Sequence, residues 1–225
     1  MTPRLLRFGE GEHRVVVVDG IGDPPQRIVD LAATLAPFPR GPNPGYPGVR
    51  RVVDESDVTA FAYVRRLLEA AAPFIGGGFG VDGFDLIEAS FSIVTTPADR
   101  LTPAQRAPHF DSTDPKYLAV MHFVSGIAGS GTAFYRQRAT GIEAVTVANK
   151  DAFVAAARRD APALSGYVGG DNAFFEEIGH VEAAPGRLVI YQGALLHSGI
   201  IPAGLPLDPD PRVGRLTANL FVKGH

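Results

Sequence analysis

Two histidines and one aspartate are spaced in this sequence as the ligands of one metal ion would be. His109 and Asp111 lie two positions apart in the segment PHFD (108–111), and residues two apart on a strand project from the same face. His197 ends the segment GRLVIYQGALLH, in which an apolar strand, a glycine turn and a short further strand precede it. Two imidazoles and one carboxylate leave three positions open on an octahedral ion. This ligand set suits iron(II) in oxygenases, where a co-substrate and dioxygen both need a position.

Other side chains of the same types compete for the ligand roles, and their local sequences disfavour them. His122 lies in AVMHFV (119–124), where strand alternation predicts a packed histidine, and His180 follows EEIG on an exposed strand or turn. Asp114 lies in STDP, which is a turn sequence. The glycine cluster at 76–80 lacks the Lys-Ser/Thr of a phosphate-binding loop, so we interpret it as a flexible turn.

The HxD pair, the distant His197 and an arginine that opens the next strand resemble the 2-oxoglutarate- and iron(II)-dependent oxygenase superfamily, nearest its prolyl-hydroxylase-like branch. The resemblance covers about residues 85–222. Three stretches, YPGVR (46–50), PHFDSTDP (108–115) and GTAFYRQRATG (131–141), also resemble a bacterial family of uncharacterised proteins within that superfamily. The resemblance implies that His109, Asp111 and His197 hold Fe(II). It also implies that 2-oxoglutarate is consumed as co-substrate while a second substrate is oxidised, with hydroxylation as the first expectation.

The resemblance also assigns the residues that would bind 2-oxoglutarate. In the superfamily an Arg or Lys on the strand after the second histidine holds the far carboxylate, and here the matching residue is Arg215 at the start of RLTANLFV. A guanidinium suits a carboxylate bidentately, and Thr217 and Asn219 share its strand face. His197 and Arg215 are eighteen positions apart, a longer gap than is usual in the superfamily, which makes Arg212 in the intervening loop a rival.

Three further residues are candidates for the pocket. Tyr191 alternates with Val189 on its strand, so it faces either the pocket, beside the co-substrate, or the core. Arg136 and Arg138 flank Gln137 after a strand that lines the mouth of the active site in the superfamily. These two arginines are solvated, or they anchor an acidic substrate or a loop of the chain itself.

The elements that must position these residues change in type along the chain. The first part predicts a strand at 14–19, a helix opened by Pro24-Pro25, a proline-rich loop at 37–48 and a helix from Asp57 to Phe74 that the glycines at 76–80 end. Later residues alternate in short β-rich runs, at 85–95, 118–124, 132–136, 176–183, 187–191 and 215–222, with one helix near 149–159 that Asn149 caps. We therefore predict one α+β domain over 1–225: a double-stranded β-helix (jelly roll) over 85–225, buttressed over 1–84 by helices together with the first strands.

Composition narrows the possible partners. The 225 residues carry a net charge of −3, include no cysteine and show no basic run, which disfavours nucleic acid and excludes thiolate metal sites. No stretch has the length of a membrane span or the pattern of a signal peptide. We expect a cytoplasmic protein with a small-molecule or peptide substrate and no membrane partner, and these features leave room for a homodimer.

Two alternatives remain open from the sequence. A cupin-type metal enzyme would work without 2-oxoglutarate, although the chain lacks the HxH pattern of such enzymes. A non-catalytic binding protein on an oxygenase fold is the other. Halogenases of the superfamily lose the carboxylate ligand, and the presence of Asp111 argues against that route.

Overall fold

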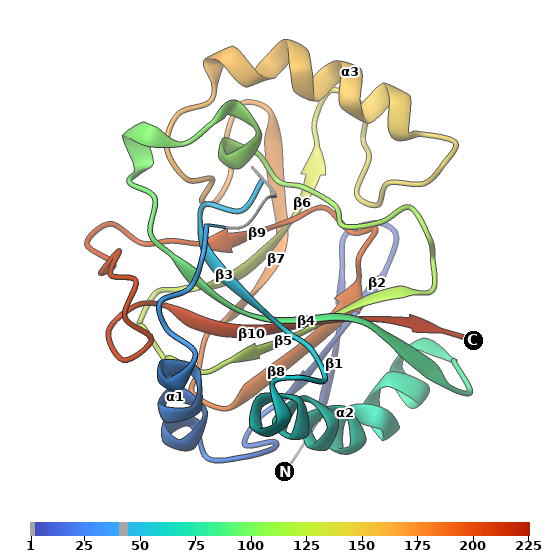
Figure 1. Ribbon diagram of the computed structural model, residues 1–225. Helices are drawn as coiled ribbons and strands as arrows, with labels where there is room; N and C mark the ends of the chain where they lie inside the picture. The colour runs from blue at the N-terminus through green and yellow to red at the C-terminus, as the bar shows by residue number, and fades with distance from the viewer. Residues whose placement is uncertain (1–2, 41–44) are drawn as a thin grey trace.

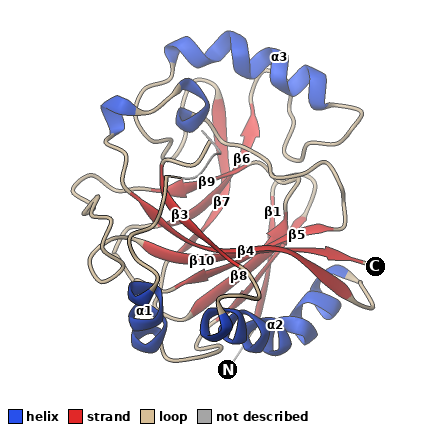
Figure 2. Ribbon diagram, in the orientation of Figure 1, coloured by secondary structure: helices blue, strands red, loops and turns tan. Residues whose placement is uncertain are grey.

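The computed structural model describes residues 3–40 and 45–225 and folds them into two antiparallel sheets and three α-helices (Figures 1 and 2). The seven-stranded sheet has the order β1-β2-β8-β5-β10-β4-β3, and the three-stranded sheet has the order β7-β6-β9. The strands are β1 (Arg4–Phe8), β2 (His13–Val18), β3 (Gly48–Val53), β4 (Phe84–Val94), β5 (Tyr117–Phe123), β6 (Gly131–Gln137), β7 (Phe175–Glu182), β8 (Arg187–Gln192), β9 (His197–Ile200) and β10 (Leu216–Gly224). The helices are α1 (Pro25–Thr34), α2 (Val58–Phe79) and α3 (Lys150–Asp160), with 3-10 turns at Ala98–Arg100, Pro103–Arg106 and Ala161–Ala163.

The elements stack in layers held by three buried apolar clusters. α1 and α2 cover one face of the large sheet, the small sheet faces its other side, and α3 lies over the small sheet (Figure 1). Between the sheets, Val15 and Val17 of β2 and Phe123 of β5 pack with Phe134 of β6. The predicted α+β class and jelly-roll core, with N-terminal helices against the sheet, are confirmed. No helix among the described residues is long and apolar enough to cross a membrane.

The first 84 residues contribute strands as well as helices. The strand predicted at 14–19 is β2, whereas the edge strands β1 and β3 were not predicted. Of the proline-rich loop predicted at 37–48, residues 41–44 lie outside the described residues, and β3 begins at Gly48.

Helix α2 corrects one prediction, because it continues through the glycines expected to end it. It runs to Phe79 and stops at Gly80, whose left-handed φ of 66° and N–H bond to the Gly76 carbonyl close the last turn. The glycines permit close packing, since a Cβ on Gly78 would lie 2.7 Å from a methyl of Val16. Tertiary contact with β2 therefore outweighs the weak helix propensity of glycine.

The residues that precede α2 and α3 do not cap them through their side chains, although Asn149 was predicted to cap α3. Asp57 precedes α2 and Asn149 precedes α3, but neither side chain makes a capping hydrogen bond. Asp57 instead pairs with Arg51 at 2.6 Å, and the Asn149 carboxamide bonds the backbone at Thr146 and Ala144.

The inner face of the large sheet carries a polar stripe along β10 and β4. Thr217 lies opposite Ser92, and Asn219 lies opposite Ser90. Because residues directly opposite on neighbouring strands share a face, all four side chains point toward the small sheet.

Candidate metal centre

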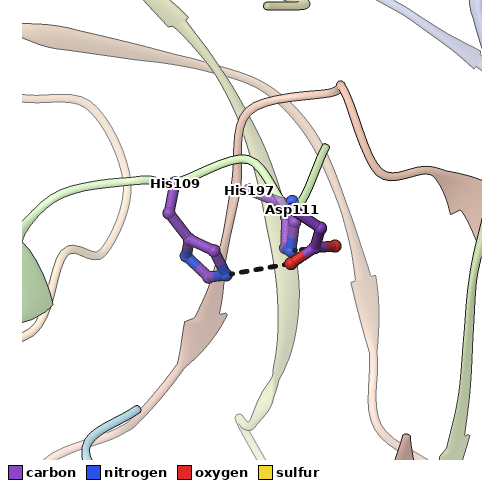
Figure 3. A group of neighbouring side chains, drawn as sticks. All are labelled: His109, Asp111 and His197. Carbon is purple, nitrogen blue, oxygen red and sulfur yellow. Dashed lines mark ion pairs between the residues drawn. The ribbon is translucent and has the colours of Figure 1, made fainter. Parts of the chain in front are cut away.

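The structure brings His109, Asp111 and His197 together. Figure 3 shows the three side chains converging, two from the loop before β5 and one from the start of β9. Their ligand atoms all lie within 4.8 Å of one another. Nε2 of His109 is 3.8 Å from one Asp111 carboxylate oxygen, and Nε2 of His197 is 3.6 Å from the other. The ring of His197 is oriented by a hydrogen bond between its Nδ1 and the carbonyl oxygen of Leu195 at 2.8 Å.

Backbone pairing positions these ligands, although the HxD pair does not lie within a regular strand as predicted. His109 forms an isolated β-bridge with His197, and the Asp111 N–H donates to the Gly193 carbonyl at 2.7 Å. The segment 109–111 is therefore extended and attached to the small sheet at His109. That conformation still sends the His109 and Asp111 side chains to one side, as the spacing predicted.

The surroundings favour the protonation states that bind a metal. Burial lowers the pKa of His197 to about 4. The pKa of His109 is also lowered, by desolvation first and by the charge of His197 second. Burial raises the pKa of Asp111, and the charges of His109 and Arg50 oppose that shift. At neutral pH both imidazoles are uncharged and can donate a lone pair to a metal, and one Asp111 oxygen is buried without a hydrogen bond to any residue that the structure describes. A cation would satisfy this oxygen.

Arg215 lies just before β10, and its residue is only 4% exposed. One guanidinium nitrogen donates to the Gly131 carbonyl at 2.8 Å, and the group lies 5.6 Å from the centre of the Phe123 ring. Nε has no hydrogen-bond partner, and no acidic side chain of the described residues pairs with this cation. Burial lowers the pKa of Arg215. A buried cation without a counter-ion is costly, so an anionic ligand would stabilise it.

Three tyrosines surround Arg215. Tyr191 packs edge-to-face on His197 at 4.8 Å, and the charges of Asp111 and Arg215 both act on its pKa, in opposite directions. Burial raises the pKa of Tyr46 to about 12 and raises that of Tyr167 as well. All three phenols therefore remain protonated at neutral pH. The Tyr46 hydroxyl is buried, and its interaction with the Ser92 hydroxyl opposes the rise of its pKa. Neither Tyr46 nor Tyr167 was predicted as a site residue from the sequence.

The remaining predicted residues divide between the interior and the surface. The Thr217 hydroxyl is buried and accepts a hydrogen bond from Asn219 Nδ2 at 3.3 Å. The side-chain oxygen Oδ1 of Asn219 has no partner among the described residues. Arg212 is exposed and pairs with Asp210 in the loop before Arg215.

Arg136 and Arg138 contact acidic residues of the chain itself. Arg136 pairs with Glu143 at 2.5 Å and with Glu10 at 3.0 Å, and Arg138 pairs with Asp171 at 3.3 Å. Of the roles considered from the sequence, these ion pairs match the one in which the two arginines anchor a loop of the chain itself.

The rival ligands lie in other environments. His122 is fully buried on β5, and its Nδ1 shares a 2.8 Å hydrogen bond with the Tyr63 hydroxyl. His180 lies on the exposed side of β7 beside Glu177. Asp114 accepts the N–H of Lys116 in a turn and pairs with Lys223 at 2.8 Å. None of the three belongs to the group of ligand atoms around Asp111.

Known proteins share this fold. A family model described as "Family of unknown function (DUF6445)" matches residues 1–222. No curated protein matches the sequence. SnoN, described as a non-heme alpha ketoglutarate dependent epimerase from nogalamycin biosynthesis, superposes with a TM-score of 0.56 at 12% identity, covering 93% of this chain and 78% of SnoN.

HygX from Streptomyces hygroscopicus gives a second comparison. Its structure with nickel and 2-oxoglutarate bound has a TM-score of 0.53 at 12% identity, covering 93% of this chain and 82% of HygX. Its structure with iron bound has a TM-score of 0.50 at 11% identity, covering 94% and 83%. The predicted resemblance to the 2-oxoglutarate- and iron(II)-dependent oxygenases is thus confirmed at the level of the fold.

Proposed function

The chain belongs to DUF6445, a family of unknown function, and we propose that it is an iron(II)- and 2-oxoglutarate-dependent oxygenase that hydroxylates a small-molecule or peptide substrate. One observation carries the proposal: a buried arginine without an acidic partner among the described residues lies beside Gly199, two residues from His197 of the two-histidine, one-carboxylate cluster. A metal ion alone would account for the cluster of His109, Asp111 and His197. A metal-bound ligand that also places a negative charge on Arg215 would account for the cluster and for the buried arginine.

The donor set fits iron(II). Neutral imidazoles and one carboxylate on one side of an ion form the facial triad of non-haem iron oxygenases, and the remaining positions stay open. When bound, the iron supplies the site at which 2-oxoglutarate and dioxygen react. His109, Asp111 and His197 would hold the ion, and the Leu195 carbonyl oxygen fixes the ring orientation of His197.

The buried arginine fits the far carboxylate of 2-oxoglutarate. Arg215 offers a fork of N–H donors, and Tyr46 offers a buried hydroxyl within electrostatic range of it. HygX, which shares this fold, is described with nickel and 2-oxoglutarate bound, and this supports 2-oxoglutarate as the co-substrate proposed here. Tyr191 and Phe123 are buried beside Arg215, where they keep water from the arginine and strengthen its interaction with an anion.

We also propose that residues 1–225 act as one oxygenase-like domain. Strands β2 and β3 from the first 84 residues pair with β8 and β4 from the remainder, so the two parts share one sheet.

The test is consumption of the co-substrate and its dependence on the proposed ligands. Purified protein supplied with Fe(II) and air should convert 2-oxoglutarate to succinate, and the Asp111→Ala variant should not. In parallel, 2-oxoglutarate should raise the melting temperature of the metal-loaded protein, because a ligand that binds only the folded state stabilises it. If 2-oxoglutarate is neither consumed nor stabilising, a cupin-type metal enzyme without 2-oxoglutarate becomes the better proposal. If the protein also binds no metal, the better proposal is a non-catalytic binding protein on an oxygenase fold.

A further inference from the structure

A second arginine of the inner face is not explained by the metal or by 2-oxoglutarate. Arg50, on β3, lies across from Ser92 of β4 and so shares the face of the polar stripe. Its Nη2 donates to the Ser90 hydroxyl and to the Glu88 carboxylate, both at 2.7 Å, and its Nε donates to the Ser92 hydroxyl at 3.3 Å. Its side chain is 16% exposed. Three polar residues alternating along one strand thus hold this guanidinium in place.

The Arg50–Glu88 pair retains free hydrogen-bonding capacity. Nη1 of Arg50 makes no hydrogen bond with a residue that the structure describes, and neither does the second carboxylate oxygen of Glu88. The Glu88 side chain is 38% exposed, so a ligand can approach the pair. The pair therefore presents one cationic donor and one anionic acceptor side by side.

The pair lies on the same side as the metal ligands. Phe221 of β10 is directly opposite Glu88, and its ring stacks on Tyr117 with centroids 5.5 Å apart. Tyr117 and Asp111 flank the same glycine, since a Cβ on Gly193 would lie 2.8 Å from Tyr117 Cδ1 and 3.2 Å from Asp111 Cβ. The charge of Arg50 also acts to lower the pKa of Asp111. These contacts lead from Glu88 to the carboxylate ligand in four steps, through Phe221, Tyr117 and Gly193.

We propose that Arg50 and Glu88 form a substrate subsite that binds the zwitterionic head group of a free α-amino acid, with the carboxylate on Arg50 and the ammonium on Glu88. The inference rests on the proposed function and names the substrate class of the same site. Arg215 and Arg50 then have separate tasks, the first for the co-substrate and the second for the substrate.

Charge complementarity selects a zwitterion over other ligands. An acid without an amine would place its carboxylate beside Glu88, and an amine without a carboxylate would meet Arg50; like charges at such distances are costly. A zwitterion places its carboxylate next to Arg50 and its ammonium next to Glu88, so each charge has an opposite neighbour. It also adds no net charge to a half-buried site. The serine hydroxyls that hold Arg50 reduce the side-chain entropy lost on binding.

The experiment measures binding without turnover. Protein loaded with Mn(II), which accepts the same nitrogen and oxygen ligands, is heated with and without 2-oxoglutarate in the presence of each standard L-amino acid. The N-acetyl and α-amide derivatives of the same amino acids serve as probes that lack the ammonium or the carboxylate. We expect at least one free amino acid to raise the melting temperature and its two blocked derivatives to fail.

Three variants assign the effect to the pair. Arg50→Gln and Glu88→Gln should each weaken binding of that amino acid at least about tenfold, as loss of one partner of a close charge pair does. Arg51→Gln is the matched control, because Arg51 is the next residue on β3 and pairs with Asp57 instead; it should bind as wild type does. Since Glu88→Gln keeps its shape and its place on β4, it tests the subsite even if Arg50→Gln does not fold.

The outcomes separate the two proposals. If 2-oxoglutarate stabilises the protein but no free amino acid does, or if blocked derivatives bind equally well, the subsite is wrong and the oxygenase proposal stands. The same holds if both Gln variants retain wild-type binding. If 2-oxoglutarate has no effect while a free amino acid binds through Arg50, the oxygenase proposal is wrong and the subsite stands.

Discussion

His109 and His197 donate backbone hydrogen bonds to each other's carbonyl oxygens, both at 2.9 Å, and their rings lie 4.3 Å apart. The two imidazole ligands are therefore also backbone partners. A metal site held in this way does not depend on the ion to bring its ligands together. Little chain entropy remains to be lost when the ion binds, so the site is preorganised.

Asp111→Ala should abolish metal binding while the fold survives. Asp111 supplies the cluster's only negative charge, and its backbone N–H contact with Gly193 does not involve its side chain. We expect the affinity for Fe(II) or Mn(II) to fall at least about 100-fold. Mutation of residues that only hydrogen-bond to a metal ligand already lowers metal affinity by roughly 10–100-fold, and Asp111 would be a ligand itself. Metal analysis and circular dichroism test both parts. Asp114→Ala is the control, and metal loss in that variant instead would identify a different carboxylate ligand.

Arg215→Ala should weaken 2-oxoglutarate binding by roughly 2–5 kcal/mol, at least tenfold, because a buried charge-assisted contact is lost. Metal binding should remain close to that of wild type, as Arg215 contacts none of the three ligands directly. Calorimetric titration of 2-oxoglutarate into Mn(II)-loaded protein measures both quantities. Arg212→Ala, in the exposed loop, should have no effect. A reversed result would show that Arg212 holds the carboxylate.

The stability of the metal-free protein should decrease as the pH falls from about 6.5 to about 4. Burial lowers the pKa of His122 from 6.5 to about 4, so in this range the unfolded chain binds a proton that the folded chain excludes. Stability therefore rises with pH across the window, by up to about 3 kcal/mol for this residue. Urea denaturation at several pH values measures how the free energy of unfolding changes with pH. His122→Asn, which keeps a polar group near Tyr63, should reduce this slope, and an unchanged slope would assign the effect to other residues.

Glu143 should contribute to stability and not to substrate affinity. Burial opposes its ionisation, but hydrogen bonds from Gly11, Arg136 and Glu10 outweigh that cost and keep its pKa below the usual value. Glu143→Ala leaves Arg136 without its buried partner and should destabilise the fold by roughly 3 kcal/mol. Thermal or urea unfolding measures the loss. Glu176→Gln, which removes a half-exposed partner 3.6 Å from Arg136, should cost less than about 1 kcal/mol.

Much of the jelly roll was predictable because its central strands bury one or both faces. The runs predicted at 118–124, 132–136, 187–191 and 215–222 correspond to the central strands β5, β6, β8 and β10. The run at 176–183 corresponds to β7, which lies at an edge of the small sheet and was still recognised. The missed strands β1 and β3 lie at the two edges of the large sheet. Edge strands are partly exposed, so paired arginines such as Arg50 and Arg51 are tolerated and obscure the apolar pattern.

The metal ligands were predictable from spacing, whereas the rest of the site depends on tertiary structure. His109 and Asp111 are local in sequence, and His197 follows a recognisable strand. Tyr46 and Tyr167 reach Arg215 from loops, and no local pattern indicates that convergence. One sequence signal was available for the Arg50 subsite. Glu88, Ser90 and Ser92 alternate with apolar residues in EASFS, a pattern that indicates a polar inner face on β4.

The isolation of Arg215 from any acidic side chain of the described residues has a consequence for the lifetime of the protein. Without an anion, the folded chain bears the cost of a desolvated charge, and open forms accessible to proteases become more populated. A bound dicarboxylate removes that cost and lowers the open population by mass action. Resistance to proteolysis should therefore rise with the concentration of the metabolite. In a cell, the abundance of the protein would then follow the supply of its own co-substrate.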